Sequence, residues 1–148
     1  MNGYESGVKL EVKGEIEGIF EIIWSDAVDK SIIDSWNDAK EATEFGATAL
    51  AILLLLEQTD FKEFIRAYQG TGIDYWLSKG EYEAQGLPTE NRAGRLEISG
   101  ILKEAKGNTL NRRIARKKKQ SKKTDSTDLP VYIVVVEFSC PKAKVIIK

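Results

Sequence analysis

Asp74 and Glu97 are the residues of this 148-residue chain whose types and spacing could support chemistry. They lie in Ile73–Ser78 and Arg95–Gly100, two segments with strand-like alternation, and successive side chains of a strand point to opposite faces of a sheet. Each carboxylate therefore occupies the face opposite the main apolar row of its segment. Residues 80–94 are rich in Gly and Pro and could fold back to set the strands side by side. Converging carboxylates are hard oxygen ligands for a divalent cation such as Mg²⁺.

The alternative is that both acids lie on the solvated face of an antiparallel sheet, where carboxylates are common. A third acid favours the metal site. Glu44 lies in the mostly helical segment Ala27–Gln58, and it shares a helix face with Thr48 and Ala51. These two small residues leave room beside the Glu44 carboxylate.

Composition limits the possible chemistry. The chain has no His and a single Cys, Cys140, which excludes Ser-His-Asp and Cys-His systems and the usual zinc sites. Its longest apolar run, Phe45–Leu56, is shorter than the roughly 20 residues that span a bilayer. The N-terminus lacks a signal-peptide pattern. We therefore expect a soluble, cytoplasmic protein with no membrane contact and no internal disulfide.

Charge is distributed unevenly along the chain. Residues 1–102 carry 9 basic and 19 acidic residues, whereas residues 103–148 carry 13 basic and 4 acidic ones. The basic residues cluster in Lys103–Lys123, which predicts a helix that docks through Leu110 and Ile114, with Asn108 as its N-cap. We expect its cations to be largely solvated: Arg112, Arg113, Arg116, Lys117, Lys118, Lys119, Lys122 and Lys123. Such a surface is either a solvated face or a contact for a polyanion.

The remaining elements follow from periodicity. Alternation within residues 8–24 predicts a hairpin or one bent strand. Within Ala27–Gln58, Gly46 could split the helix, and Ala47–Leu56 is apolar nearly all round, as in a helix buried on several sides. The later expectations are a short capped helix with Phe61, Phe64, Ile65 and Tyr68 as apolar positions, a central strand at Val131–Phe138, and a short edge strand at Lys144–Lys148.

This order of elements resembles the core of the PD-(D/E)XK, or restriction-endonuclease-like, nuclease superfamily. Gly72-Ile73-Asp74 resembles the Gly-x-Asp motif of that family, and Leu96-Glu97-Ile98-Ser99 resembles its following motif. Glu44, or alternatively Glu41, resembles the helix acid, and Gln120 is similar to a glutamine that some branches place near the site. The resemblance spans about residues 40–138.

The resemblance implies an α/β (α+β) fold with an α-β-β-β-α-β core and a mixed sheet flanked by helices. We expect a single domain over residues 1–148, with an N-terminal strand or hairpin extension at 1–25 and the nuclease-like core at 26–148. Asp74, Glu97 and Glu44 would be the metal ligands, for Mg²⁺ or Mn²⁺. The family's lysine is missing, because Ser99 stands at its position and cannot supply a positive charge. Lys40, Arg116 or Lys119 could replace it.

Two functions follow. The first is metal-dependent hydrolysis of nucleic-acid phosphodiesters, with Asp74, Glu97, Ser99 and Glu44 at the catalytic site and phosphates bound by Arg112, Arg113, Arg116, Lys117, Lys119 and Gln120. The alternative is a catalytically inactive relative that binds nucleic acid or protein, and its protein partner could be a second copy of the chain in a homodimer. The acidic N-terminal part and the short C-terminal edge strand would be the surfaces for a protein partner.

Overall fold

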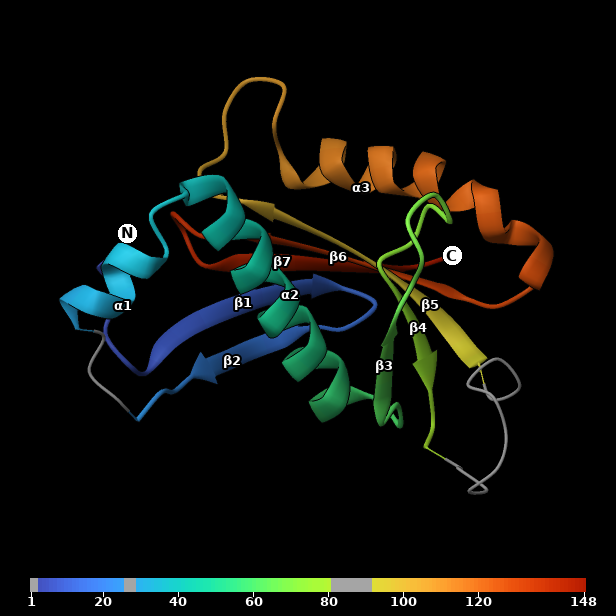
Figure 1. Cartoon of the computed structure of the whole chain (residues 1–148), viewed down its shortest axis with the longest axis horizontal. Helices are drawn as coiled ribbons and strands as arrows, with labels where there is room; N and C mark the ends of the chain where they lie inside the picture. Colours follow the sequence, from blue (N-terminus) through green and yellow to red (C-terminus); the bar gives the residue numbers. More distant parts are fainter. Residues whose placement is uncertain (1–2, 26–28, 81–91) are drawn as a thin grey trace.

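The computed structural model describes residues 3–25, 29–80 and 92–148. Over these residues the chain forms an α+β fold with three α-helices and a seven-stranded, mixed, open sheet (Figure 1). The strands are β1 Val8–Gly14, β2 Gly18–Ile22, β3 Glu63–Arg66, β4 Tyr75–Ser78, β5 Arg92–Ile101, β6 Val131–Glu137 and β7 Lys142–Ile147. The helices are α1 Lys30–Ser35, α2 Ala39–Gln58 and α3 Leu110–Gln120, followed by a 3₁₀ helix, η1, at Ser121–Thr127. None of the helices in the described ranges is long and apolar enough to cross a membrane.

The strands are ordered β2-β1-β7-β6-β5-β4-β3 in the sheet. Strands β3, β4 and β5 form an antiparallel meander, and α3 then connects β5 to β6, which runs parallel to it. The predicted central position of β6 is confirmed, because three strands lie on each side of it. The N-terminal alternation forms a hairpin, in which β1 and β2 pair antiparallel. Residues 81–91, most of the predicted bend, lie outside the described ranges.

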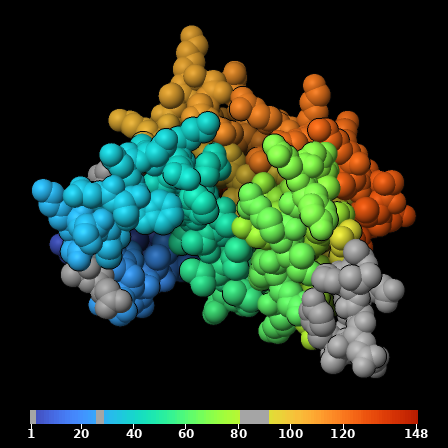
Figure 2. All heavy atoms as spheres, in the orientation of Figure 1, coloured from blue at the N-terminus to red at the C-terminus, as the bar shows by residue number. Residues whose placement is uncertain are grey.

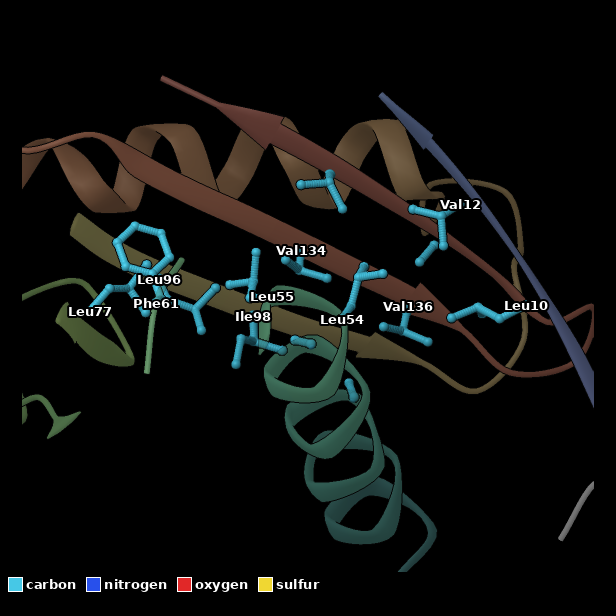
Figure 3. Packing of buried hydrophobic residues seen from close by; sticks show 14 residues of the cluster. Leu10, Val12, Leu54, Leu55, Phe61, Leu77, Leu96, Ile98, Val134 and Val136 are labelled. Carbon is cyan, nitrogen blue, oxygen red and sulfur yellow. The ribbon is translucent and has the colours of Figure 1, made fainter. Parts of the chain in front are cut away.

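Helices α2 and α3 cover opposite faces of the sheet. Along β6, Val134 and Val136 pack in a core cluster with α2, whereas Ile133 and Val135 pack in a second cluster with Ile114 of α3. Figure 3 shows the first cluster, with α2 lying against β5 and β6. The continuous β-branched run of β6 thus buries both faces of the strand, as expected for the centre of a sheet with helices on both sides.

The segment predicted as mostly helical, residues 27–58, contains two helices. Its break lies between Ser35 and Ala39, while Gly46 is inside α2. Helix α2 begins after Asp38, which is its N-cap: Asp38 Oδ1 accepts hydrogen bonds from the N–H groups of Lys40 and Glu41.

The expectation that Ala47–Leu56 is buried on several sides is wrong. Only one side of α2 faces the sheet, through residues such as Ala47, Ala51 and Leu55, while the Leu53 side chain is 60% exposed.

The short helix predicted around Phe61–Tyr68 is also wrong, because this segment contains strand β3. Asp60 does not cap a helix, and its carboxylate pairs with Lys79 at 2.6 Å instead. β3 pairs antiparallel with β4, with Phe64 opposite Leu77. Pairing with the open edge of β4 satisfies the backbone and places Phe64 against the core, which outweighs the local helical pattern.

The last strand is not an edge strand. β7 pairs antiparallel with β6 and parallel with β1, so the edges of the sheet are β2 and β3. The physical reason is the N-terminal hairpin, which adds to the free side of β7 and moves the edge two strands outward. The C-terminal strand therefore offers no edge for a protein partner.

Candidate functional site

Asp74 lies directly before β4 and is held against β5. Its backbone N–H donates to the Leu96 carbonyl at 2.9 Å, and its side-chain Oδ2 accepts from the Ile98 N–H at 2.7 Å. The loop that leads into Asp74 is seated by Gly72, whose φ is +79°. A Cβ at this glycine would lie 2.5 Å from the Gln120 carbonyl oxygen. Glycine therefore lets the β3–β4 loop approach the end of α3 and bring Asp74 beneath this helix.

Glu97 comes from the centre of β5, and its side chain is fully buried. Its strand neighbours Leu96 and Ile98 pack on the α2 side, so Glu97 points to the α3 side. There Lys117 of α3 places its Nζ 2.5 Å from Glu97 Oε2 and 3.5 Å from Asp74 Oδ2. The structure thus brings the two carboxylates together on one face of the sheet, one at the start of β4 and one on the adjacent β5, where they share one ammonium group.

The protonation of Glu97 is shifted by this environment. Burial raises the pKa of the Glu97 carboxyl to about 7, because the charged form loses its hydration. Lys117 opposes the rise, and the negative charge of Asp74 adds to it. Glu97 Oε1 is buried and accepts no hydrogen bond from the residues that the structure describes. One oxygen of the carboxylate is therefore paired, and the other is available to a proton or a cation.

Lys117 is not among the cations expected to replace the missing lysine, which were Lys40, Arg116 and Lys119. Helix phase explains the difference. Ile114 of α3 is buried, and a residue three positions later lies on the same side of a helix. Extending the apolar stripe of Leu110 and Ile114 by three residues is the sequence signal that identifies Lys117.

Arg113, one turn before Lys117, also turns inward. Its Nη1 donates to Ser99 Oγ at 3.1 Å, and its Nε donates to Asn108 Oδ1 at 2.7 Å. Asn108 therefore fixes the guanidinium of Arg113. It is not the N-cap of α3, as predicted, because Thr109 occupies that position. Arg113 and Lys117 are partly buried, so the expectation that both are largely solvated is wrong. Position 99 thus has a positive charge beside it, supplied by α3 instead of by the strand.

Glu44 lies on the α2 side of β5. Its Oε2 accepts a long hydrogen bond from the Gly100 N–H at 3.4 Å, and Thr43 next to it packs against Gly100. Within residues 3–25, 29–80 and 92–148, no group of three or more acidic, His or Cys side chains could hold a metal ion. The described site is therefore a pair of carboxylates with one lysine.

This pair fits one kind of metal ion. Mg²⁺ commonly keeps several waters and is held by one or two carboxylates together with substrate phosphates. The unpartnered Oε1 of Glu97 and the neighbouring Asp74 carboxylate are suitable hard ligands for such an ion. The site does not fit an ion that requires a full set of protein ligands.

The remaining cations of α3 and η1 point outward. Those that are exposed are Arg112, Arg116, Lys118, Lys119, Lys122 and Lys123, and Gln120 is exposed beside them. None of these cations forms an ion pair with an acid in the described part of the chain. The positive surface is therefore not neutralised from within those residues.

Arg95 fixes the far end of this basic surface. Its side chain is buried, and its guanidinium donates to the Leu129 carbonyl, Thr124 Oγ1 and Asp125 Oδ1. These bonds join η1 to β5. The end of the basic segment is thus held close to the strand that carries Glu97.

Comparisons with family models, with curated proteins and with solved structures give no match for this chain.

Proposed function

We propose that this protein is a divalent-metal-dependent phosphodiesterase that acts on nucleic acid, with a divergent restriction-endonuclease-like core. The observation that carries the proposal is the Asp74–Lys117–Glu97 cluster, in which carboxylates from adjacent strands meet one ammonium group from a basic helix. The order α2-β3-β4-β5-α3-β6, with β5 and β6 parallel, agrees with the core that the motifs resemble.

Asp74 and Glu97 would hold the Mg²⁺ or Mn²⁺ ion. When bound, such an ion lowers the pKa of a coordinated water and neutralises charge on the phosphate. Lys117 keeps a positive charge beside both carboxylates, which is the role that the resemblance assigns to position 99. The Arg113 side chain is already held by its hydrogen bonds to Ser99 and Asn108. Its guanidinium could therefore bind a phosphate with little further loss of conformational entropy.

The exposed cations of α3 would position the nucleic-acid backbone. Phosphate contacts of this kind are independent of base sequence and depend strongly on salt. Replacing Arg112, Arg116 or Lys119 by Ala should each lower the slope of log K against log salt by about one. Lys9→Ala, on β1, is the matched control and should leave the slope unchanged.

The test of catalysis is cleavage of labelled single- and double-stranded DNA and RNA with Mg²⁺ or Mn²⁺. Lys117→Met should lower the cleavage rate by about a hundredfold or more, since it removes a charge next to the reacting phosphate. Lys118→Met is the matched control, because Lys118 is exposed on the same helix and has no contact with the carboxylates. Glu97→Gln and Asp74→Asn should also lose activity.

A second candidate is a nucleic-acid-binding module without catalysis. The observation that favours it is the ion pairing itself, because Lys117 already neutralises charge at both carboxylates without any metal. If wild-type protein binds nucleic acid at low salt but cleaves no substrate with either metal, this reading replaces the enzyme. Cleavage that survives equally in Lys117→Met and Lys118→Met would also overturn the proposed site.

A further inference from the structure

The candidate metal site already contains a cation of the protein itself. Lys117 Nζ lies 2.5 Å from Glu97 Oε2 and 3.5 Å from Asp74 Oδ2, so one ammonium group bridges the two carboxylates. A divalent ion held by Asp74 and Glu97 would need oxygens that Lys117 now contacts. The ammonium group and such an ion therefore compete for the same ligands.

Two cations of α3 face this part of β5, and they are held in different ways. Arg113 is fixed by two directional hydrogen bonds, from Nη1 to Ser99 Oγ and from Nε to Asn108 Oδ1. Among the residues that the structure describes, the polar contacts of Lys117 Nζ are those to the two carboxylates. An ammonium group on a flexible four-carbon stem can turn to another anion without a change in the backbone. Lys117 is thus the movable cation of the pair.

The cluster is open to solvent on one side. The Lys117 side chain is 15% exposed and that of Asp74 is 29% exposed, whereas Glu97 has no exposed surface. In Figure 2 the light-green atoms of the β3–β4 loop, which leads into Asp74, lie beside the orange atoms of α3. Arg116 and Lys118, the neighbours of Lys117 in the chain, are exposed on this helix. A nucleic-acid backbone on α3 therefore passes within reach of the Lys117 side chain.

The charges of the cluster oppose an ion in the absence of substrate. Asp74 and Glu97 supply two negative charges when both are ionised, and Lys117 and Arg113 place two positive charges beside the same face of β5. A divalent ion would add two more positive charges to a balanced set. A phosphate supplies negative charge and gives Lys117 a new partner, so it favours the ion in both ways.

We infer that Lys117 is a displaceable internal cation, which occupies the ion site of the free protein and moves to a phosphate when nucleic acid binds. Because Asp74 and Glu97 must bind a divalent ion for this exchange to occur, the inference rests on the proposed function. The free protein then binds the ion weakly, and ion and nucleic acid each raise the affinity of the other. Linkage requires these two factors to be equal.

The exchange predicts that loss of the lysine strengthens ion binding. In calorimetric titrations with Mn²⁺ at pH 8 and without nucleic acid, Lys117→Met should bind the ion about tenfold or more tightly than wild type, because a nearby unit charge repels a divalent ion. Lys118→Met, at an exposed site of the same helix, is the matched control and should equal wild type. Asp74→Asn added to Lys117→Met should remove the gain. An unfolded variant would lose affinity instead of gaining it.

Two measurements on wild type test the movement of the side chain. Acetylation of Lys117 by an N-hydroxysuccinimide ester, followed by peptide mass spectrometry, should become several-fold faster with saturating Mn²⁺, while the rate at Lys118 stays the same. Ca²⁺ at constant ionic strength should tighten binding of a labelled DNA oligonucleotide several-fold, as measured by fluorescence anisotropy with the strand checked on a gel. This tightening should be smaller in Lys117→Met.

The outcomes separate this inference from the proposed activity. Ion binding by Lys117→Met that is no tighter than in wild type, or Lys117 acetylation that does not respond to bound ion, would overturn the inference and leave metal-dependent cleavage in place. If neither protein binds Mn²⁺ and no substrate is cleaved, the proposed function fails and the inference fails with it. Tighter ion binding combined with slower cleavage in Lys117→Met is the result expected.

Discussion

At the scale of single residues, the buried Glu97 determines the electrostatics of the candidate site. A carboxylate with no exposed surface is costly unless it is paired, and only one of its oxygens is paired with Lys117. Two states can relieve the remaining cost: a proton on the carboxyl or a cation beside it. The raised pKa of Glu97 reflects the first state, and metal binding would produce the second.

The pH dependence of stability should report on Glu97. Its folded-state pKa of about 7 lies above the ordinary value of 4.5, so the folded protein binds more protons than the unfolded chain between these values. The contribution of this group to the free energy of unfolding therefore falls by up to about 3 kcal/mol as pH rises from 4.5 to 7. Urea unfolding at pH 5 and pH 8 should show this loss in wild type and a smaller one in Glu97→Gln. Glu57→Gln, at an exposed site, should behave as wild type, and an unchanged loss in Glu97→Gln would contradict the assignment.

Metal binding should compete with the same proton. Mg²⁺ or Mn²⁺ at ten times its dissociation constant stabilises the folded state by about 1.4 kcal/mol, a shift in melting temperature of roughly 3–6 °C for a chain of this size. The shift should be larger at pH 8 than at pH 6, because the ion binds the ionised carboxylate. Asp74→Asn should abolish the shift, whereas Asp34→Asn on α1 should retain it. A thermal shift that is the same at both pH values would argue against Glu97 as a ligand.

At the scale of elements, the site depends on two close contacts with β5. Helix α3 supplies Arg113 and Lys117 on one face of this strand. On the other face α2 approaches at Gly100, where a Cβ would lie 2.5 Å from the Thr43 carbonyl oxygen. The absence of a side chain at position 100 thus sets the distance between α2 and the strand that carries Glu97.

Gly100→Ala should therefore push α2 away from β5. Overpacking of a close contact typically costs about 1–3 kcal/mol, measured here as a loss in the free energy of unfolding in urea. Adding Thr43→Ser should restore little of the lost stability. This change removes the Thr43 methyl group, which lies 2.7 Å from the Cβ position of residue 100, but it leaves the Thr43 carbonyl oxygen in place. Gly46→Ala is the matched control, since its Cβ would meet only the Phe138 ring, at 3.1 Å, and alanine favours the helix. Full recovery by Thr43→Ser would show that the side chain alone sets the spacing.

At the scale of the whole molecule, the N-terminal hairpin is part of the sheet. β1 pairs with β7, which in turn pairs with the central β6, and Leu10 and Val12 belong to the same core cluster as α2. The hairpin and the candidate site are therefore linked by continuous pairing across the sheet.

This continuity predicts one cooperative unfolding transition. Trp24 follows β2, and Trp76 is buried in β4, so the two residues report on opposite ends of the sheet. Proteins that retain only Trp24 or only Trp76, with Phe at the other tryptophan positions, should each show fluorescence and circular dichroism curves that coincide in urea. An earlier transition of the Trp24 signal would reveal a hairpin that unfolds independently.

The sequence by itself determined the features that depend on local pattern. Alternation around Asp74 and Glu97 placed both carboxylates on the same face, and the β-branched run of Val131–Phe138 identified the central strand. Alternation within residues 8–24 indicated either a hairpin or one bent strand, and the hairpin is what forms. These features follow from periods of two or 3.6 residues, which a single segment reveals. The site's two carboxylates and its basic helix were therefore predictable.

Only the tertiary structure decided the features that depend on which segments meet. β3 is a strand because the edge of β4 offers it hydrogen-bond partners, and β7 is internal because the hairpin pairs with it. Lys117 is the cation of the candidate site because the docking of Ile114 against the sheet sets the rotation of α3 about its axis. A helix rotated by the angle of one residue would present a different side chain to Glu97. A pocket between β2 and α2 likewise depends on how much of the seven-stranded sheet α2 covers. No local pattern in the chain encodes the width of the sheet.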